Sequence, residues 1–377
     1  MEAGDMNDSD TAIKVECLQA SYGDCLLITC YLGKSARSKR TWRLLIDTGP
    51  EECWPILKAR LGKIELNTLG KRRIDLAIIS HIDHDHIGGA HKLFSDTSLG
   101  LDFGDVWFNA RKHLGNPLYK DRSVAEGQAL GWILDAGDKL PWNRAFNGEA
   151  IMTRGKGGYL EIQTNLNLPK LTLLSPTPKR LKALAKVWAR EVKRLAAKQS
   201  NTTMERGRSS AFPDLVKLTG IETRNDRSAS NGSSIAVLLE HRGASVLLTA
   251  DAFSAVLARA IINLIRDRKV AHPIEVDAFK LSHHGSRANF KTEFLGFIKS
   301  KNYIVSTNNT RFAHPDDETL ARVVLYGGIQ QKLWFNYKTP QNERWATPDL
   351  CHNHDYRVGL PPDDNSGILL ELPPKDN

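Results

Sequence analysis

The sequence predicts an α/β fold in which two β-sheets pack face to face with helices on their outer faces. Three observations predict it. Apolar runs of strand length dominate the chain up to residue 90 and again after residue 230, and amphipathic helical segments alternate with them. The middle of the chain is helical and basic instead. We therefore expect one domain over residues 12–377 that carries a basic helix-and-loop insertion over residues 178–230, after a disordered N-terminus over residues 1–11.

Each expected strand is an alternating or continuous apolar run that ends at a turn signal such as Asp47-Thr48-Gly49-Pro50. The expected strands cover residues 13–20, 25–32, 41–47, 74–80, 105–109, 171–176, 233–241, 244–251, 276–286, 301–308, 332–337 and 366–372. The expected helices cover residues 54–65, 86–94, 123–139, 178–198, 252–266 and 317–325, and residues 199–230 are expected to be a loop.

The positive charge is concentrated in one segment. The chain carries a formal net charge of +9, and residues 179–227 contain 13 Lys and Arg against 5 Asp and Glu. A clustered basic surface favours an anionic partner, most often nucleic acid, although a solvated helix face is the alternative interpretation. The expected substrate-binding residues are the cations of the amphipathic helix: Lys179, Arg180, Lys186, Arg190, Lys193 and Arg194.

Composition gives further expectations on location. The 377 residues are 41% hydrophobic and 25% charged, and no run reaches the roughly 18 apolar residues of a membrane span. The N-terminal residues are acidic and polar, unlike a secretory signal. The five cysteines are odd in number and lack paired metal-ligand spacing, which is typical of reduced thiols. We therefore expect a cytoplasmic protein.

The densest group of candidate ligands follows the apolar run 74–80. His81, Asp83, Asp85 and His86 lie within six residues and precede Gly88-Gly89. Imidazole nitrogens and carboxylate oxygens bind Zn²⁺, Mn²⁺ or Fe, and glycine lets the backbone pass close to the ions. The pattern therefore predicts a metal site rather than structural histidines.

At these residues the sequence resembles the metallo-β-lactamase superfamily, whose signature is H-x-H-x-D-H. The spacing H-x-D-x-D-H is similar to that of the hydrolase domain of the DNA-uptake protein ComEC and its soluble relatives. The resemblance continues through Tyr22-Gly23-Asp24-Cys25, Leu45-Ile46-Asp47-Thr48-Gly49, Asn231-Gly232-Ser233-Ser234, Leu247-Leu248-Thr249-Ala250-Asp251, Lys280-Leu281-Ser282-His283-His284-Gly285-Ser286 and Ala313-His314-Pro315. It implies a four-layer αββα metallo-β-lactamase sandwich.

The resemblance also implies two divalent metal ions, Zn or Mn, with Mg as a further candidate. Metal 1 would take His81, Asp83 and Asp251, and metal 2 would take Asp85, His86, Asp251 and one of His283 and His284. The separate histidine of the superfamily's third motif has no counterpart. Carboxylates in place of imidazoles favour harder ions such as Mn²⁺ or Mg²⁺. Ala250 replaces a glycine of the family pattern, a change we expect to be tolerated.

Other residues are expected to support the ligands or the reaction. Those expected to orient the ligands are Asp24, Asp47, Asn231, Ser233 and Ser234. Those expected to take part in catalysis are Asp85, Lys280, His284 and His314. His314, Lys280 and the second histidine of the pair are candidates for binding a phosphate or protonating a leaving group, and an orienting role for His314 is the alternative.

Three functions compete on this site. The leading hypothesis is a metal-dependent nuclease or phosphodiesterase that cleaves DNA. The second is a hydrolase of a small ester, lactone or cyclic nucleotide, since fold does not fix substrate. The third is a degenerate metal-binding regulator. The resemblance further implies an effector of bacterial antiviral defence with an activating protein or protease as partner, and Arg206 and Arg208 then mark a switch or cleavage point.

Two further clusters receive structural interpretations. Cys351-His352-Asn353-His354 lacks a partner pair and is expected to be a surface loop. Trp334, Phe335 and Tyr337 are expected to pack in the core, with base stacking as the alternative.

Overall fold

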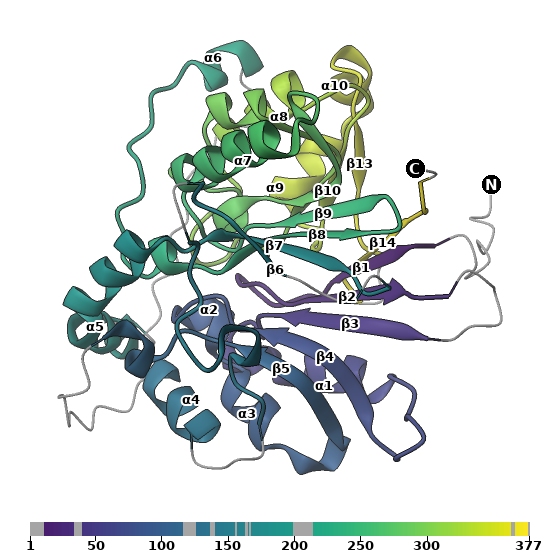
Figure 1. Ribbon diagram of the computed structural model, residues 1–377. Helices are drawn as coiled ribbons and strands as arrows, with labels where there is room; N and C mark the ends of the chain where they lie inside the picture. Colours follow the sequence, from purple (N-terminus) through teal and green to yellow (C-terminus); the bar gives the residue numbers. More distant parts are fainter. Residues whose placement is uncertain are drawn as a thin grey trace.

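The computed structural model contains two sheets that pack against each other with helices on both outer sides (Figure 1). It describes residues 11–33, 40–115, 126–135, 140–154, 157–162, 165, 167–198, 214–362 and 366–375, with the backbone alone for 126, 189 and 191–198. The predicted αββα layering is confirmed. The disordered N-terminus expected over residues 1–11 lies almost wholly outside the described residues.

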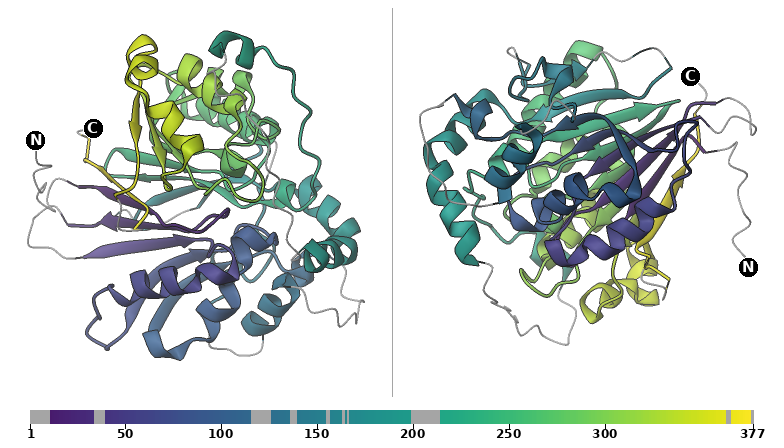
Figure 2. Two further views of the ribbon diagram at one scale, coloured as in Figure 1. Left: turned by 180° about the vertical axis from the view of Figure 1, so that it is seen from behind. Right: turned by 90° about the horizontal axis from the view of Figure 1, so that it is seen from below.

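The first sheet has six strands in the order β14-β1-β2-β3-β4-β5. They are β14 (Ile368–Leu372), β1 (Ile13–Cys17), β2 (Leu26–Tyr31), β3 (Thr41–Ile46), β4 (Arg72–Ile78) and β5 (Leu101–Trp107). Helices α1 (Trp54–Gly62), α3 (Ala90–Ser95) and α4 (Glu126–Asp135) lie on its side of the molecule (Figures 1 and 2).

The second sheet has eight strands in the order β13-β12-β11-β10-β9-β8-β7-β6. They are β13 (Arg357–Gly359), β12 (Lys332–Phe335), β11 (Ile298–Val305), β10 (Ile274–Lys280), β9 (Ala244–Leu248), β8 (Ala236–His241), β7 (Lys170–Ser175) and β6 (Leu160–Ile162). Its outer side carries α6 (Leu215–Thr219), α7 (Ser254–Arg268), α8 (Asp317–Tyr326), α9 (Pro340–Glu343) and α10 (Pro348–Asn353).

Consecutive residues of the strands are buried in different layers. Ile28 and Leu44 belong to the core between the sheets, whereas Leu27 and Leu45 pack under the helices of the first sheet with Leu57. Because both faces of each sheet are covered, these strands are continuous apolar runs rather than alternating ones.

Several local predictions need correction. The strand expected over residues 105–109 is β5 and begins four residues earlier, at Leu101. The segment expected to be a loop over 199–230 contains α6, which forms because the Asp214 side chain accepts hydrogen bonds from the amides of Val216 and Lys217. Leu215 and Leu218 anchor this helix in the core.

Helix α5 (Pro178–Lys198) has the predicted bounds. It connects β7 to β8 and lies at one end of the sandwich, beside α2 (His84–Ile87) and α4 (Figures 1 and 2). Leu181, Leu184 and Trp188 are buried, as expected for its apolar stripe.

The remaining sequence expectations concern cysteines, aromatics and membranes. Cys17, Cys25, Cys30 and Cys53 are buried free thiols. Phe335 is buried, and the Lys332 amine lies 3.6 Å from the Trp334 ring centroid. Cys351 and its neighbours form helix α10 rather than a loop, because Pro348 occupies its first turn. No helix within the described residues has the length and apolar character needed to cross a membrane.

Candidate metal centre

The candidate ligands lie where the carboxyl ends of strands from both sheets meet. Parallel strands β3 and β4 deliver Asp47 and the His81–His86 segment from the first sheet. Parallel strands β9, β10 and β11 deliver Asp251, the His283-His284 pair and Ser306 from the second. The open ends of parallel strands are where α/β proteins place ligands, because the loops that follow such strands converge.

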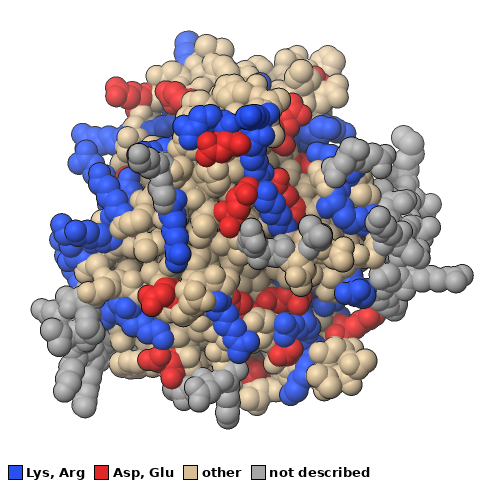
Figure 3. Space-filling view, viewed as in Figure 1, with Lys and Arg blue, Asp and Glu red and all other residues tan. Residues whose placement is uncertain are grey.

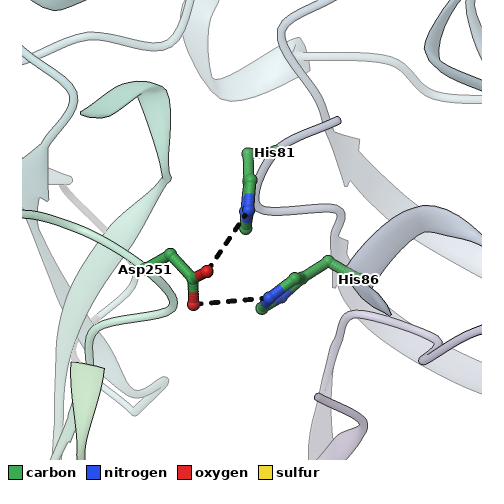
Figure 4. Close-up of side chains that lie close together, drawn as sticks. All are labelled: His81, His86 and Asp251. Carbon is green, nitrogen blue, oxygen red and sulfur yellow. Dashed lines mark ion pairs between the residues drawn. The ribbon is translucent and has the colours of Figure 1, made fainter. Parts of the chain in front are cut away.

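Asp251 is the central residue of the group. Its Oδ2 lies 3.7 Å from His81 Nε2 and its Oδ1 lies 3.3 Å from His86 Nε2 (Figure 4). The same Oδ2 lies 3.5 Å from His283 Nε2. The two oxygens of one carboxylate therefore face two different groups of ligands. This is the arrangement of a bridging carboxylate.

The second group forms around Asp85. His284 Nε2 lies 3.5 Å from Asp85 Oδ2 and 4.0 Å from Asp251 Oδ1. Asp83 lies on the other side, with Oδ2 3.9 Å from His81 Nε2. Donor atoms about 2.0–2.2 Å from a tetrahedral ion are roughly 3.3–3.6 Å apart, so the separations of 3.3 and 3.5 Å fit ligands that share an ion.

The two histidines of the pair divide between the groups. His283 faces Asp251 Oδ2 on the side of His81, and His284 faces Asp85. The sequence left open which of them is a ligand, and the geometry brings both to the site. His283 thus adds a third imidazole nitrogen beside Asp251, on the side of His81.

In each of the four imidazoles, a hydrogen bond at Nδ1 orients the ring and leaves Nε2 to face the carboxylates. Asp47 Oδ2 accepts from His86 Nδ1 at 2.8 Å and from Ser80 Oγ at 2.7 Å, and Ser80 Oγ lies 2.9 Å from His81 Nδ1. Because the Ser80 hydroxyl donates to Asp47, it accepts from His81. Both rings therefore direct Nε2 at Asp251.

The histidine pair is oriented in the same way from the second sheet. His284 Nδ1 donates to the Ser306 carbonyl at 2.8 Å. His283 Nδ1 donates to Asn289 Oδ1 at 2.9 Å, and the Asn289 amide is fixed because its Nδ2 donates to Asp226 and to the Asp251 carbonyl. The four Nε2 atoms are left to face the carboxylates.

The burial of these atoms tests whether metal ions fit. His81 Nε2, His86 Nε2, His284 Nε2 and Asp251 Oδ1 are buried and have no hydrogen-bond partner among the described residues. Buried polar atoms without partners are costly, and here they point at one another with donor types that bind Zn²⁺ or Mn²⁺. Divalent cations would satisfy all of them at once, so the residues fit the group.

The charge distribution of the metal-free protein leads to the same conclusion. Burial lowers the pKa of His81 to about 4, aided by the neighbouring His86 and opposed by Asp251, so His81 is neutral. Burial alone would also lower the pKa of His284, but Asp24 and Asp85 raise it to about 9. Burial opposes ionisation of Asp251 too, yet the surrounding histidines hold the pKa of this carboxyl well below its ordinary value. The carboxylates thus require positive charge beside them, from protons or from metal ions.

Lys280 and Asp24 lie behind the ligands. The Lys280 amine is buried and bonded to Asp24 Oδ2, while Asp24 Oδ1 accepts from Ser306 Oγ and lies 3.2 Å from His284 Nδ1. Burial would raise the pKa of Asp24, but the charges of Lys280 and His284 hold it far below its ordinary range. In this structure the Lys280 amine supports Asp24, and the catalytic role expected for Lys280 stays a prediction.

Close backbone packing explains two of the sequence motifs. A side chain at Gly23 would bring its Cβ within 2.0 Å of the Asp85 carbonyl oxygen, and the Asp24 amide donates to that same oxygen. Asp47, Ala250, His283 and His284 all have left-handed backbone, with φ of 57°, 45°, 50° and 53°. Ala250 therefore adopts the conformation that favours the glycine of the family pattern.

The remaining candidates surround this centre. Asn231 Nδ2 donates to Asp226 at 2.7 Å, while Ser233 Oγ donates to the Ser230 carbonyl and Ser234 is buried in the same turn. The His314 ring centroid lies 5.2 Å from that of His283, and His314 Nδ1 lies 3.4 Å from Asp316. Asn231 and His314 therefore lie beside His283, whereas the roles of Ser233 and Ser234 stay predictions.

The basic helix contributes one residue close to the centre. Arg180 packs over the Phe253 ring at 4.5 Å and lies against Gly232. The exposed cations elsewhere on α5 include Lys179, Lys186 and Arg190. The side chains of Lys193 and Arg194 lie outside the described residues.

Sequence reasoning missed four residues that orient ligands: Ser80, Asp226, Asn289 and Ser306. Only Ser80 could have been identified from the sequence, since it directly precedes the candidate ligand His81. Asp226 and Asn289 belong to no motif, and Asp226 is distant from His283 in the sequence.

Comparison with known families adds one match. The family model described as "Metallo-beta-lactamase superfamily" matches residues 40–102, the segment from β3 through the His81–His86 ligands. This match supports a relationship between the chain and the metallo-beta-lactamase superfamily. The two-sheet architecture is consistent with it, whereas the ComEC-like branch stays a prediction. A search of curated proteins gave no significant match.

Several solved structures resemble the chain at low sequence identity. They include Zn²⁺-bound PqqB from Methylobacterium extorquens (12% identity, 95% of this chain and 100% of that one, TM-score 0.43). Human tRNase Z, short form, is 10% identical over 96% of this chain and 99% of its own, with a TM-score of 0.42. The metallo-beta-lactamase fold protein YhfI from Bacillus subtilis is 12% identical over 95% and 99%, with a TM-score of 0.36.

Proposed function

We propose that the protein is a metal-dependent hydrolase of phosphodiesters, and that its substrate is nucleic acid, with DNA favoured. The observation that carries this proposal is the convergence of four histidine Nε2 atoms on Asp85 and the two oxygens of Asp251. A pair of divalent ions held there would activate water and stabilise negative charge on the phosphate oxygens.

The protein's own groups supply position and charge. Asp251, with one oxygen toward each group, would hold two ions close together, and the Asp47 and Asn289 hydrogen bonds would keep the imidazoles aimed at them. His314, beside His283 and next to Asp316, is placed to contact a phosphate oxygen or the leaving group.

The basic helix supports nucleic acid over a small neutral ester. Lys and Arg side chains gather at the edge of the molecule where α5 lies (Figure 3). Arg180 connects that surface to the residues around Asp251 through Phe253 and Gly232. A cationic surface leading to a metal centre suits a polyanion.

The test is cleavage of single-stranded DNA, duplex DNA, RNA and cyclic nucleotides by the purified protein with Mn²⁺, Zn²⁺ or Mg²⁺. We expect DNA cleavage with Mn²⁺ that Asp85→Ala and His86→Ala abolish. Asp102→Asn is the matched control, since Asp102 pairs with Arg73 at the surface of the first sheet.

Three outcomes distinguish the nuclease from the other hypotheses. Hydrolysis of small esters, lactones or cyclic nucleotides with intact DNA would support the second hypothesis. Rates that fall steeply with salt indicate a polyanionic substrate, because binding then releases counterions. DNA that stays intact with every metal would refute the nuclease.

A further inference from the structure

Beside the metal centre, Tyr22, Arg311, Phe312 and His314 form a small cluster, which we call the aromatic wall. The His314 ring is 6.2 Å from the Phe312 ring and nearly parallel to it, with an interplanar angle of 27°. On its other side His314 lies 5.2 Å from the ring of the candidate ligand His283. One ring, that of His314, therefore separates Phe312 from the candidate ligand His283.

Phe312 is the exposed member of the aromatic wall. Its side chain is 38% exposed, whereas Tyr22 is 8% exposed and packs edge-on against it at 5.9 Å. The fold supplies rigid support, because Tyr22 directly precedes Gly23, which packs against the Asp85 backbone. A fixed aromatic ring with a solvent-facing side beside a catalytic centre is suited to contact substrate.

Arg311 adds positive charge to the same place. Its guanidinium lies 4.7 Å from the Tyr22 ring centroid and 5.5 Å from that of Phe312, and it donates to the Tyr22 hydroxyl. These contacts hold the cation against two aromatic rings. An aromatic surface flanked by a fixed cation is the combination that binds single-stranded nucleic acid, through base stacking and attraction of the backbone.

We propose that Phe312 is the stacking platform for the nucleobase next to the phosphodiester bond that is cleaved, with Arg311 beside it to attract the backbone. This inference rests on the proposed function and narrows it. A base stacked on Phe312 is unpaired, so the substrate is single-stranded or frayed at the point of cleavage. The platform stacks any base and therefore gives no sequence preference.

Binding tests the platform separately from catalysis. The manganese-loaded protein is titrated with 2′-deoxyadenosine 5′-monophosphate and with 2-deoxyribose 5-phosphate, two monoesters that differ only in the base. We expect the nucleotide to bind about tenfold more tightly, the size of one stacking contact. Phe312→Ala should remove this preference and Phe312→Trp should retain it.

Tyr326→Ala is the matched control, since Tyr326 is an equally exposed aromatic residue (43%) at the far end of α8. Equal binding of the two ligands by the wild type, or a preference that survives Phe312→Ala, would overturn the platform. Circular dichroism checks that each variant folds. If Phe312→Ala does not fold, Phe312→Leu is used in its place.

Cleavage assays in parallel separate the two proposals. If no phosphodiester is cleaved but Phe312 carries the base preference, the platform stands and the nuclease fails. If DNA is cleaved and Phe312→Ala leaves both the base preference and KM for single strands unchanged, the nuclease stands and the platform fails.

Discussion

At the residue scale, each candidate ligand depends on a neighbour that fixes its orientation. The motif spacing pointed to His81, Asp83, Asp85 and His86, which follow a strand end that the sequence marks clearly, and the family resemblance pointed to Asp251. Neither could predict Asp226, which lies more than fifty residues before His283. Asn289 is only six residues from His283 but belongs to no motif. Nor could the sequence show that the Lys280 amine is bonded to Asp24.

The substitution Asp47→Asn tests the orienting role of Asp47. This carboxylate accepts from His86 Nδ1, Ser80 Oγ and the Ser80 amide, and an amide side chain has too few acceptors for all three. We expect metal affinity to fall about 10–100-fold. Competition with a fluorescent chelator measures it, and Asp102→Asn should bind metal like the wild type. An unchanged affinity in Asp47→Asn would contradict the role.

Metal binding should release protons at neutral pH. Although burial acts to lower the pKa of His284, the nearby carboxylates raise it to about 9, so its imidazole is protonated at pH 7 and must lose that proton to bind a metal. Below pH 9 the apparent affinity should therefore rise with pH, by about tenfold per unit for one displaced proton. Calorimetry in buffers of different ionisation enthalpy counts the protons. A binding heat that is independent of the buffer would refute this.

The same pKa has a consequence for stability. Because the folded value exceeds the ordinary value of 6.5, protonated His284 stabilises the metal-free protein fully below pH 6.5. That contribution is lost as the pH rises toward 9. The free energy of unfolding of the metal-free protein, measured with urea, should therefore contain a stabilisation by His284 that decreases between pH 6.5 and 9. His284→Asn should remove this pH-dependent part.

At the element scale, apolar periodicity predicted the long elements well and the short ones poorly. The bounds of α5 agree because its stripe of Leu181, Leu184 and Trp188 continues over several turns. Helix α6 has five residues and depends on the Asp214 cap, a signal too local to stand out in a polar segment. The proposed switch at Arg206 and Arg208 lies outside the described residues.

Helix α5 provides a test of the nucleic-acid interface. Replacing Lys179, Lys186 and Arg190 with Gln should raise KM for DNA and leave kcat unchanged, because these exposed side chains lie outside the ligand groups. For duplex DNA, the slope of log affinity against log salt should become shallower by about 0.9 for each phosphate that the variant no longer neutralises. The control replaces three exposed lysines elsewhere, Lys63, Lys71 and Lys301, with Gln. Equal effects of the two triple variants would contradict a specific role for α5.

At the scale of the whole molecule, the candidate centre joins the two sheets. His81, Asp83, Asp85 and His86 belong to the first, and Asp251, His283 and His284 to the second. The αββα layering was predictable because runs of strands flank a helical middle, and the fold alone then brought the ligand loops together. The division of the histidine pair between two groups could not be predicted from the sequence, because it depends on how the two loops meet.

Metal ions should therefore stabilise the entire domain. Free metal at a hundred times its dissociation constant should raise the free energy of unfolding by about 2.7 kcal/mol, since the unfolded chain cannot assemble the ligands. Urea unfolding with metal and with chelator measures the difference, and Asp251→Asn should largely remove it while Asp102→Asn keeps it. An equal gain in Asp251→Asn would show that metal binds elsewhere.

The left-handed backbone at Asp47, Ala250, His283 and His284 has a consequence for metal choice. Such residues cost roughly 1–2 kcal/mol each, so the packing of the surrounding loops must sustain them. This backbone conformation sets the directions from which the side chains can approach a cation. We therefore expect the centre to discriminate among cations by their preferred coordination angles as well as by charge and softness.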